Sequence, residues 1–325
     1  MKQQLFEQKY QAAWTRFAEQ LGVLEGQRDP AISLADFARQ YRKICYDLAL
    51  AKERHYSPQL VDFLNDLAFR GHRQLYASDN SGLWHRFLSF VLVGFPRAVR
   101  KEWKMVLLGL GLFYIPGLIF GALIYFHPSL TFSFFSPEHV SQFSQMYNPA
   151  LHDSMREARG SSDDLYMFGF YIRNNIGIGF QTFAGGILFG LGSLFFLVYN
   201  GLAIGGVAGY LTHLGYIDSF YSFVISHGSF ELTAIGIAGA AGMKMGFALI
   251  MPGSLSRRQA LLQGAREAVP LVYGVILFLL IAAFIEAFWS PSSTVPDKVK
   301  YWVGGGLWAF VAFYLMFAGR ERHRR

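Results

Sequence analysis

The sequence predicts an all-α fold, a polytopic membrane helix bundle preceded by a helical region outside the membrane. Only 16% of the 325 residues are charged and 53% are hydrophobic, whereas soluble proteins carry about 25% charged residues. The charges are also unevenly spread, because residues 1–104 hold a normal density of them and residues 105–319 hold long apolar runs. Several of these runs approach the roughly 20 residues that a transmembrane helix needs.

The region before the membrane, residues 1–84, is predicted to be a cytoplasmic helical domain. Apolar residues recur there at three- and four-residue intervals, the spacing of one helix face: Leu34, Phe37, Tyr41, Ile44 and Leu48. A helix around 4–21 and another that starts at Pro58 complete a hairpin or small bundle, since proline suits the first turn of a helix.

The segment 85–104 is predicted to be an interfacial elbow helix. It begins with apolar residues, is interrupted at Gly94 and Pro96, and ends in basic residues. The interruption makes it too short to span a bilayer, and the apolar-then-basic order is typical of a helix that lies at the membrane surface.

The transmembrane domain, residues 105–319, is expected to hold about six transmembrane helices. Its apolar runs lie near 105–126, 172–195, 199–216, 228–251, 268–289 and 301–318. The third run is short and rich in glycine, so it either spans the membrane or re-enters it in a protein-lined space. Asn200-Gly201 favours a tight turn and predicts a hairpin between the second and third runs.

The orientation follows from the positions of lysine and arginine. These residues gather before the first run, between the fourth and fifth runs, and in the basic tail at 320–325. Because cytoplasmic loops carry an excess of Lys and Arg, six spans with both termini in the cytoplasm are predicted. The acidic loop 127–171 is then extracytoplasmic, and its length suggests short helices.

Small residues recur along several runs and predict close contacts between helices. Lipid chains offer no hydrophobic drive for helix association, so such grooves mark helix packing. The contacts either hold one compact bundle together or form a homo-oligomer. The residues concerned are Gly201, Gly205 and Gly209 in the third run, and Ala234, Ala238, Gly242 and Gly246 in the fourth.

His227 and Glu231 form the most informative motif, because residues four apart share one face of a helix and ionisable groups within a membrane are usually functional. Three interpretations stay open. In a structural one, Ser226 caps the fourth helix and Glu231 lies in its first turn, where the dipole favours a carboxylate. The pair could instead bind protons or ions, or hold a catalytic metal. Zinc needs three protein ligands, and this motif supplies two at most.

Other polar residues are candidates for an intramembrane polar site with this pair. Lys244 lies deeper in the fourth run, where it either reaches back to the cytoplasmic interface or faces a buried carboxylate. Glu286, near the outer end of the fifth run, is expected at a similar depth to His227. Asn174 and Asn175 at the start of the second run predict a packed or watery environment.

Several function classes find no support in the sequence. It contains no Walker A, GxGxxG, GxSxG or HExxH motif, so we expect no enzyme activity, no cofactor and no metal. The net charge is +7, but no basic run with interleaved aromatics suggests nucleic-acid binding. The single Cys45 excludes an intrachain disulfide. The partner that the sequence does predict is the lipid bilayer.

The chain resembles the stage II sporulation protein M family of bacterial integral membrane proteins. The resemblance rests on SHGSFELTAIGIAGAAGMKMG (226–246), NNIGIGFQTFAGGILFGLGSLFFLVYNGLAIG (174–205), QYRKICYDLALAKE (40–53), LNDLAFRGHRQLY (64–76) and FPRAVRKEW (95–103). The HGxxE stretch with its small-residue tail is fairly specific, and Ser226 stands where the family often has proline. The family takes its name from a sporulation protein that scaffolds peptidoglycan-degrading enzymes. The resemblance implies a bacterial inner-membrane protein with envelope partners, and it implies no catalytic residues.

The leading functional hypothesis is a non-enzymatic, homo-oligomeric inner-membrane protein that scaffolds or recruits partners in cell-envelope processes, including peptidoglycan-remodelling proteins. The second hypothesis is a transporter or channel in which the His/Glu site lines a polar path. The third is a metal-dependent membrane hydrolase.

Overall fold

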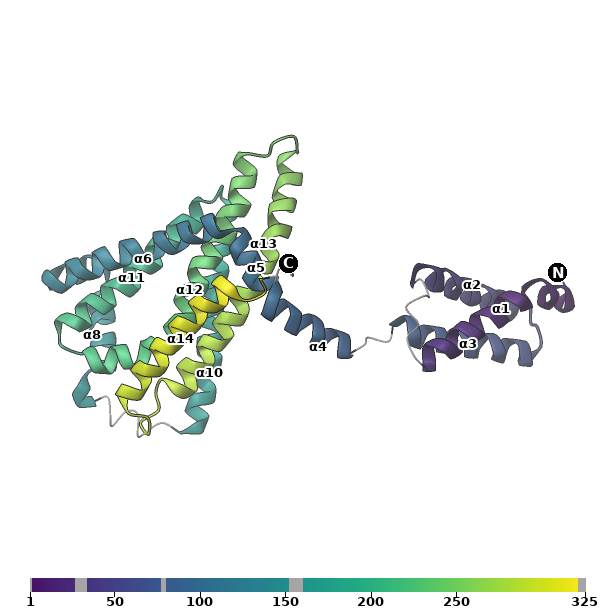
Figure 1. Ribbon diagram of the computed structural model, residues 1–325, viewed down its shortest axis with the longest axis horizontal. Coiled ribbons are helices and arrows are strands. Elements are labelled where there is room, and N and C mark those ends of the chain that lie inside the picture. The colour runs from purple at the N-terminus through teal and green to yellow at the C-terminus, as the bar shows by residue number, and fades with distance from the viewer. Residues whose placement is uncertain (1, 27–33, 77–79, 152–159, 321–325) are drawn as a thin grey trace, which may run out of the picture. The chain divides into compact units, whose positions relative to one another are not determined.

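The computed structural model describes residues 2–26, 34–76, 80–151 and 160–320, and within these ranges the chain is helical with no β-strand. The chain divides into two compact units, Met1–Arg86 and Phe87–Arg325 (Figure 1). The division falls close to the boundary predicted after residue 84. Each unit is described by itself below.

The first unit contains three helices around a core of its own. They are α1 (Gln3–Gly26), α2 (Leu34–Glu53) and α3 (Pro58–Tyr76). The core gathers mostly aromatic side chains from α1 and mostly aliphatic ones from α2 and α3: Phe6, Trp14, Phe17, Phe37, Ile44, Leu64 and Leu67. One polar group is buried among them, because the Nε1 of Trp14 donates a hydrogen bond of 2.9 Å to the Oδ2 of Asp47.

The second unit begins with short helices and continues with long ones. The short ones are α4 (Asn80–Ser89), which starts before the division, a π-helical turn η1 (Phe90–Gly94) and α5 (Phe95–Lys101). The later elements are α6 (Trp103–Phe126), η2 (Pro128–Leu130), α7 (Thr131–Phe134), α8 (Pro137–Met146), α10 (Ser161–Ala184), η3 (Gly185–Ile187), α11 (Leu191–His213), α12 (Ile217–Ile250), α13 (Arg257–Phe284), η4 (Ile285–Trp289) and α14 (Asp297–Phe317).

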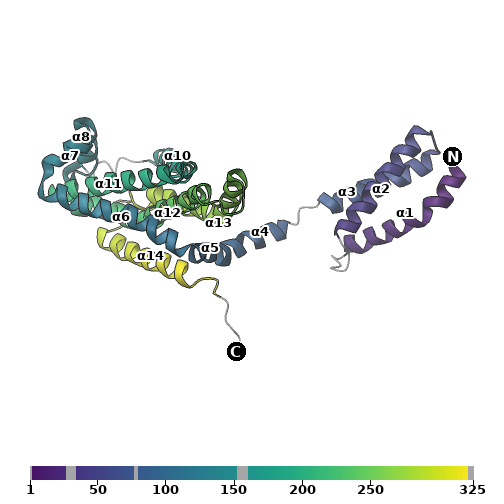
Figure 2. The ribbon, with the colours of Figure 1, turned by 90° about the horizontal axis from the view of Figure 1, so that it is seen from above.

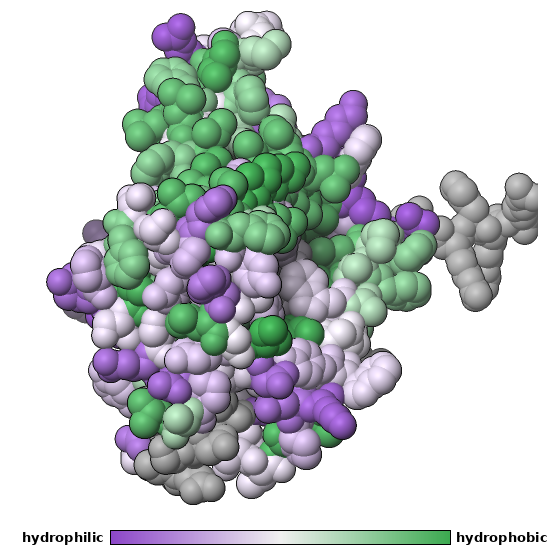
Figure 3. All heavy atoms as spheres, turned by 90° about the vertical axis from the view of Figure 1, so that its left-hand side faces the viewer, coloured by the Kyte–Doolittle hydropathy of each residue, from purple (hydrophilic) through white to green (hydrophobic). Residues whose placement is uncertain are grey.

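Five helical segments of the described chain are long and apolar enough to cross a membrane. They are Trp103–Phe126, Leu191–His213, Ile217–Ile250, Arg257–Trp289 and Asp297–Phe317. The remaining long helix of the second unit, α10, is less apolar and carries Asp163, Asp164 and Arg173. This chain is a multi-pass membrane protein. Its apolar residues gather over the upper part of the face in Figure 3, and polar residues gather below them.

Helices α6 and α11 run in the same direction with their backbones in close contact. A Cβ atom at Gly117 would lie 2.6 Å from the carbonyl oxygen of Gly201, and one at Gly121 would lie 2.7 Å from that of Gly205. Two parallel neighbours need a return segment between them, and α10 is that segment. With 24 residues it is about 36 Å long, which exceeds the roughly 30 Å hydrocarbon core. With α10, the described residues hold six crossing segments.

The bounds of the second and third predicted spans are wrong. Asn200-Gly201 does not form a hairpin, because it lies inside α11, which runs unbroken from Leu191 to His213. The turn between α10 and α11 is instead at Phe189 and Gly190, which have φ of +54° and +84°. Gly190 gives this turn its left-handed backbone. The run at 199–216 therefore spans as part of α11 and does not re-enter.

The loop after α6 is shorter than predicted. Three short helices, η2, α7 and α8, follow α6 as expected for a long loop, but α10 starts at Ser161 and not near 172. The aromatic and acidic stretch 161–171 is therefore helical. Residues 152–159 and most of the basic tail, 321–325, lie outside the described residues.

The two ends of the membrane unit meet on the same side. Arg97 donates a hydrogen bond from Nε to the carbonyl oxygen of Gly319, at 3.1 Å, and Arg100 donates to the carbonyl oxygens of Leu315 and Ala318 at 2.8 and 2.6 Å. Helix α5 thus lies against the end of α14 (Figure 2). Which compartment this side faces stays a prediction.

Helix α12 is the centre of this unit and contacts α6, α10, α11, α13 and α14. Ala234 and Ala238 are buried in its core-facing surface. Gly242 and Gly246 lie against the turn that holds Gly186 and Gly190. The small residues singled out from the sequence are thus all used in contacts within the chain.

We predict that Asp47→Asn makes the first unit less sensitive to pH. Burial raises the pKa of Asp47, although the Trp14 hydrogen bond opposes the shift. A folded-state pKa above the unfolded value means that stability is lost as pH rises from about 4 through the folded pKa. Asparagine keeps an acceptor for Trp14 and carries no charge. Thermal unfolding is measured across this pH window. The melting temperature should fall less with rising pH for Asp47→Asn than for wild type or for the control Asp62→Asn, at an exposed position. An equal fall of melting temperature with pH in the three proteins would contradict the prediction.

We predict that Gly205→Ala destabilises the membrane unit by about 1–3 kcal/mol, the usual cost of overpacking. The added methyl group would collide with the carbonyl of Gly117. Gly306→Ala in α14 is the matched control, because a Cβ there meets nothing within 4 Å and alanine favours the helix. Unfolding by a denaturing detergent measures both, and equal stability of the two variants would refute the close-packing account.

Candidate functional site

The candidate site is a buried polar cluster where α12, η4 and α10 meet. Helix α12 positions His227 and Glu231 one turn apart, with 3.9 Å between the Nε2 of His227 and the Oε2 of Glu231. Their side chains are only 5% and 14% exposed. Because α12 begins at Ile217, Ser226 is not its N-cap and Glu231 is not in its first turn. The helix-dipole interpretation of this pair is therefore wrong.

Glu286 is the third ionisable member of the cluster. The ligand atoms of His227, Glu231 and Glu286 all lie within 4.8 Å of one another. Asn175, only 1% exposed, donates a hydrogen bond of 3.2 Å from its Nδ2 to the Oε2 of Glu286. Asn174 is more exposed and reaches the cluster indirectly, donating to the Oδ1 of Asn175 at 3.1 Å.

The π-helical turn η4 places Glu286 in the cluster. Its wider turn is closed by a bond from the backbone N–H of Ser290 to the carbonyl of Ile285, at 2.8 Å. Such turns are rare and occur frequently at functional sites. The same turn brings two more side chains onto α12: the Oγ of Ser290 lies 3.1 Å from the Nδ1 of His227, and the Nε1 of Trp289 donates to the Oγ of Ser226 at 3.2 Å.

A buried lysine holds the end of this turn. The Nζ of Lys300, at the start of α14, donates to the carbonyl oxygens of Ser290 and Ser292, both at 2.8 Å. The residue is 0% exposed. Lys300 therefore fixes the backbone that carries Ser290 and supports the imidazole of His227 from a second helix.

Aromatic residues of α12 and of the loop after α6 lie beside the cluster. The ring of Phe223 lies 5.3 Å from that of His227, and Tyr147 lies against Phe223 at 6.0 Å. The carbonyl of Tyr147 accepts a hydrogen bond of 2.6 Å from Ser219. Burial is the main reason why the pKa of Tyr147 lies above its ordinary value.

Lys244 belongs to a different site. Its Nζ pairs with Glu102 at the start of α6 and with Glu267 of α13, the latter at 2.8 Å. Thirteen residues of helix separate Lys244 from Glu231, which corresponds to about 20 Å. The structure therefore groups His227, Glu231, Glu286, Asn175 and Asn174, and leaves Lys244 near the side where α5 meets the end of α14.

Sequence reasoning missed Ser290, Lys300 and Tyr147. Ser290 and Lys300 lie beyond the apolar runs, and nothing in their spacing shows that a π turn brings them to His227. The Pro137–Tyr147 segment gave no sign of lying over α12. The sequence motif alone supplied at most two metal ligands, His227 and Glu231. In the structure Glu286 adds a third from another helical segment.

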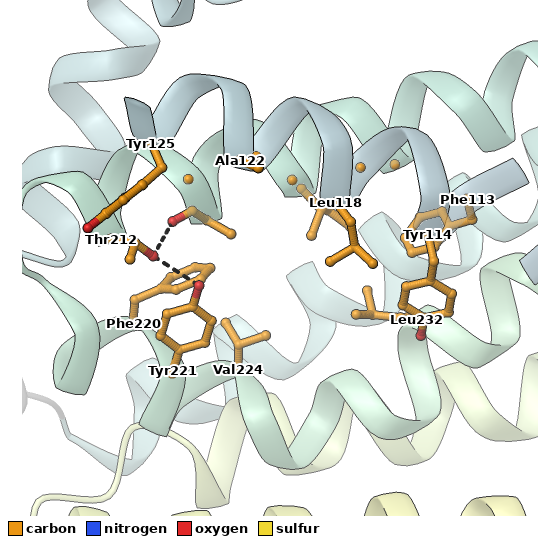
Figure 4. Close-up of a pocket in the computed structure, with 17 residues that line it drawn as sticks. Phe113, Tyr114, Leu118, Ala122, Tyr125, Thr212, Phe220, Tyr221, Val224 and Leu232 are labelled. Atoms are coloured by element: carbon orange, nitrogen blue, oxygen red, sulfur yellow. Dashed lines mark hydrogen bonds between the residues drawn. The ribbon is translucent and has the colours of Figure 1, made fainter. Parts of the chain in front are cut away.

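A separate, open apolar groove lies between α6, α11 and α12 (Figure 4). It has a volume of about 380 Å³ and is lined largely by aromatic and aliphatic residues, among them Phe113, Tyr114, Leu118, Val224 and Leu232. A hydrogen bond of 2.9 Å joins Thr212 to the hydroxyl of Tyr221 at one end. Its apolar lining suits lipid chains and offers no reactive group.

Chemically, the cluster can bind a proton or a cation. It offers two carboxylates and one imidazole, and neither carboxylate forms an ion pair with lysine or arginine among the described residues. The cluster also holds a serine beside the imidazole, with 3.1 Å between the Oγ of Ser290 and the Nδ1 of His227.

Comparison with known proteins identifies the family of the membrane unit. Residues 110–291, which contain the cluster and most of the crossing segments, match the family described as "Stage II sporulation protein M". The chain belongs to the stage II sporulation protein M family. Residues 4–77, in the first unit, match a separate family described as "Domain of unknown function (DUF8413)".

One curated relative is an uncharacterized protein, MJ0793, of Methanocaldococcus jannaschii. It is 27% identical over 128 residues, which cover 39% of this chain and 72% of the relative. No solved structure matches the chain. The resemblance to stage II sporulation protein M is thus confirmed for the membrane unit.

We predict that Lys300→Met destabilises the membrane unit by about 1–3 kcal/mol, the cost of leaving buried carbonyl groups unsatisfied. Lys298→Met is the control, since Lys298 is on the exposed side of the same helical turn. Thermal unfolding of both variants in detergent tests this prediction. A Lys300→Met protein as stable as its control would show that the hydrogen bonds of Lys300 to Ser290 and Ser292 do not stabilise the unit.

Proposed function

We propose that this stage II sporulation protein M family member is a membrane-anchored scaffold that recruits a partner in cell-envelope processes through its first unit. The observation that carries this proposal is the division of the chain into two units with separate cores. The membrane unit would hold the protein in the bilayer, and the helical unit Met1–Arg86 would bind the partner.

The surface of the first unit supports this role. Tyr46 on α2 and Phe69 on α3 are 66% and 62% exposed, although aromatic side chains are usually buried. Exposed aromatic residues are enriched at protein interfaces because they bury large areas on binding. The partner bound by the first unit would be a protein of the cell envelope, such as one that remodels peptidoglycan.

The proposal includes a place and an orientation. We place the protein in the bacterial inner membrane with both termini in the cytoplasm. The basic residues Arg97, Arg100 and Arg320 favour this orientation, since they share the side on which α5 meets the end of α14. Assembly of several copies is also part of the proposal, on faces other than the glycine contacts already used within the chain.

A crosslinking experiment in native membranes tests recruitment. A photoreactive residue at position 46 or 69 of the full chain should give one discrete adduct with a different protein, whereas one at position 305, in α14 and open to its surroundings, should not. The double substitution Tyr46→Ser and Phe69→Ser should abolish the adduct formed from position 42 on α2. Adducts only with a second copy of the chain, or none, would reject the proposal.

Ion-coupled transport is the second candidate function, favoured by the carboxylates of Glu231 and Glu286 inside the membrane unit. If the cluster carries ions, Glu231→Gln should fold normally in liposomes and lose most proton or cation flux. His213→Gln, at the end of α11, is the control. Equal flux in wild type, variant and empty liposomes would exclude transport.

A further inference from the structure

We propose that His227, Glu231 and Glu286 bind one divalent transition-metal ion, which joins α12 to the π-helical turn η4. This site goes beyond the scaffolding role and does not depend on it. It would take an ion such as Zn²⁺, Mn²⁺ or Co²⁺, whose usual ligands combine imidazole nitrogen with carboxylate oxygen.

The geometry of the three ligands is the first argument. Their ligand atoms lie within 4.8 Å of one another, and the Nε2 of His227 is 3.9 Å from Glu231. An ion about 2.1 Å from each ligand in a tetrahedral site holds its ligands about 3.4 Å apart. Small side-chain rotations of the two glutamates therefore close the site around an ion without moving a helix.

The groups behind the ligands are the second argument. A metal-binding histidine almost always uses its other ring nitrogen in a hydrogen bond that fixes the ring, and ligating carboxylates are held in the same way. Here the Nδ1 of His227 lies 3.1 Å from the Oγ of Ser290, so the Nε2 faces Glu231. Asn175 holds Glu286 through a hydrogen bond of 3.2 Å. Lys300 fixes the backbone of Ser290 in turn.

Charge is the third argument. Two carboxylates share a buried site in a membrane unit, and among the described residues neither is paired with lysine or arginine. Buried charges in proteins are paired or coordinate metals. One divalent cation balances both carboxylates. It leaves Lys300 free for the backbone carbonyls that it already contacts.

The coordination leaves an open position. Three protein ligands are fewer than the four of a closed structural zinc site, so a water molecule or a ligand would complete the shell. The ring of Phe223 lies against that of His227, and Tyr147 lies against Phe223. The ion would link α12, η4 and, through Asn175, α10.

Metal binding by the full chain tests the inference. The protein is purified in detergent after removal of any histidine tag, stripped with a chelator, and titrated with Co²⁺ and then with Zn²⁺. We expect one ion per chain, visible absorption of the Co²⁺ form that Zn²⁺ abolishes, and a raised melting temperature. Wild-type protein that takes up far less than one ion per chain overturns the proposal, whatever the variants do.

Matched variants locate the ion. His227→Gln, Glu231→Gln and Glu286→Gln should weaken binding at least as much as the 10- to 100-fold typical of changes in the supporting groups. Asn175→Ala should weaken it within that range. His213→Gln and Glu267→Gln, in the same unit but outside the cluster, should bind like wild type. If folded Glu231→Gln and Glu286→Gln proteins bind the metal ion as tightly as wild type, the ion lies elsewhere and the inference is overturned.

Discussion

The organisation of the membrane unit depends on one constraint, that polar groups inside a bilayer must be satisfied by the protein itself. Helix α12 meets this constraint because it contacts every other crossing segment. The small residues in its second half let neighbouring backbones approach closely. Nearer its start, His227 and Glu231 face η4 and α10. Close packing and the polar cluster are therefore two uses of the same central helix.

Much of the fold could be predicted from the sequence, for physical reasons. The all-α class, the two regions and most spans follow from segregated charge and from runs of apolar residues, which length and hydropathy reveal directly. The junction of α10 and α11 was misplaced because Asn200-Gly201 is a common turn pair. In this chain Gly201 serves close approach to α6 instead, and Gly190 makes the turn. Local turn chemistry gave way to helix packing.

The candidate site was only partly accessible to the same reasoning. His227 and Glu231 stand out because they are one helical turn apart, and depth alone suggested Glu286. Hydropathy does not show which way a helix is rotated about its axis. It therefore could not predict that Glu286 faces His227 and Glu231. Nor could it predict that Lys244 pairs with Glu102 and Glu267. Ser290 and Lys300 became visible only with the backbone of η4.

The π turn at Ile285–Trp289 has a consequence for how such a site arises. A π turn holds one more residue than the α-helical turn it replaces, and each residue of an α-helix rotates the side chains by about 100°. Loss of one residue after Glu286 in η4 would restore an α-helical turn and rotate Ser290 and the residues that follow it by about 100° relative to α13. Relatives that differ by this single codon would therefore keep the helices of the membrane unit and lose the serine that contacts His227.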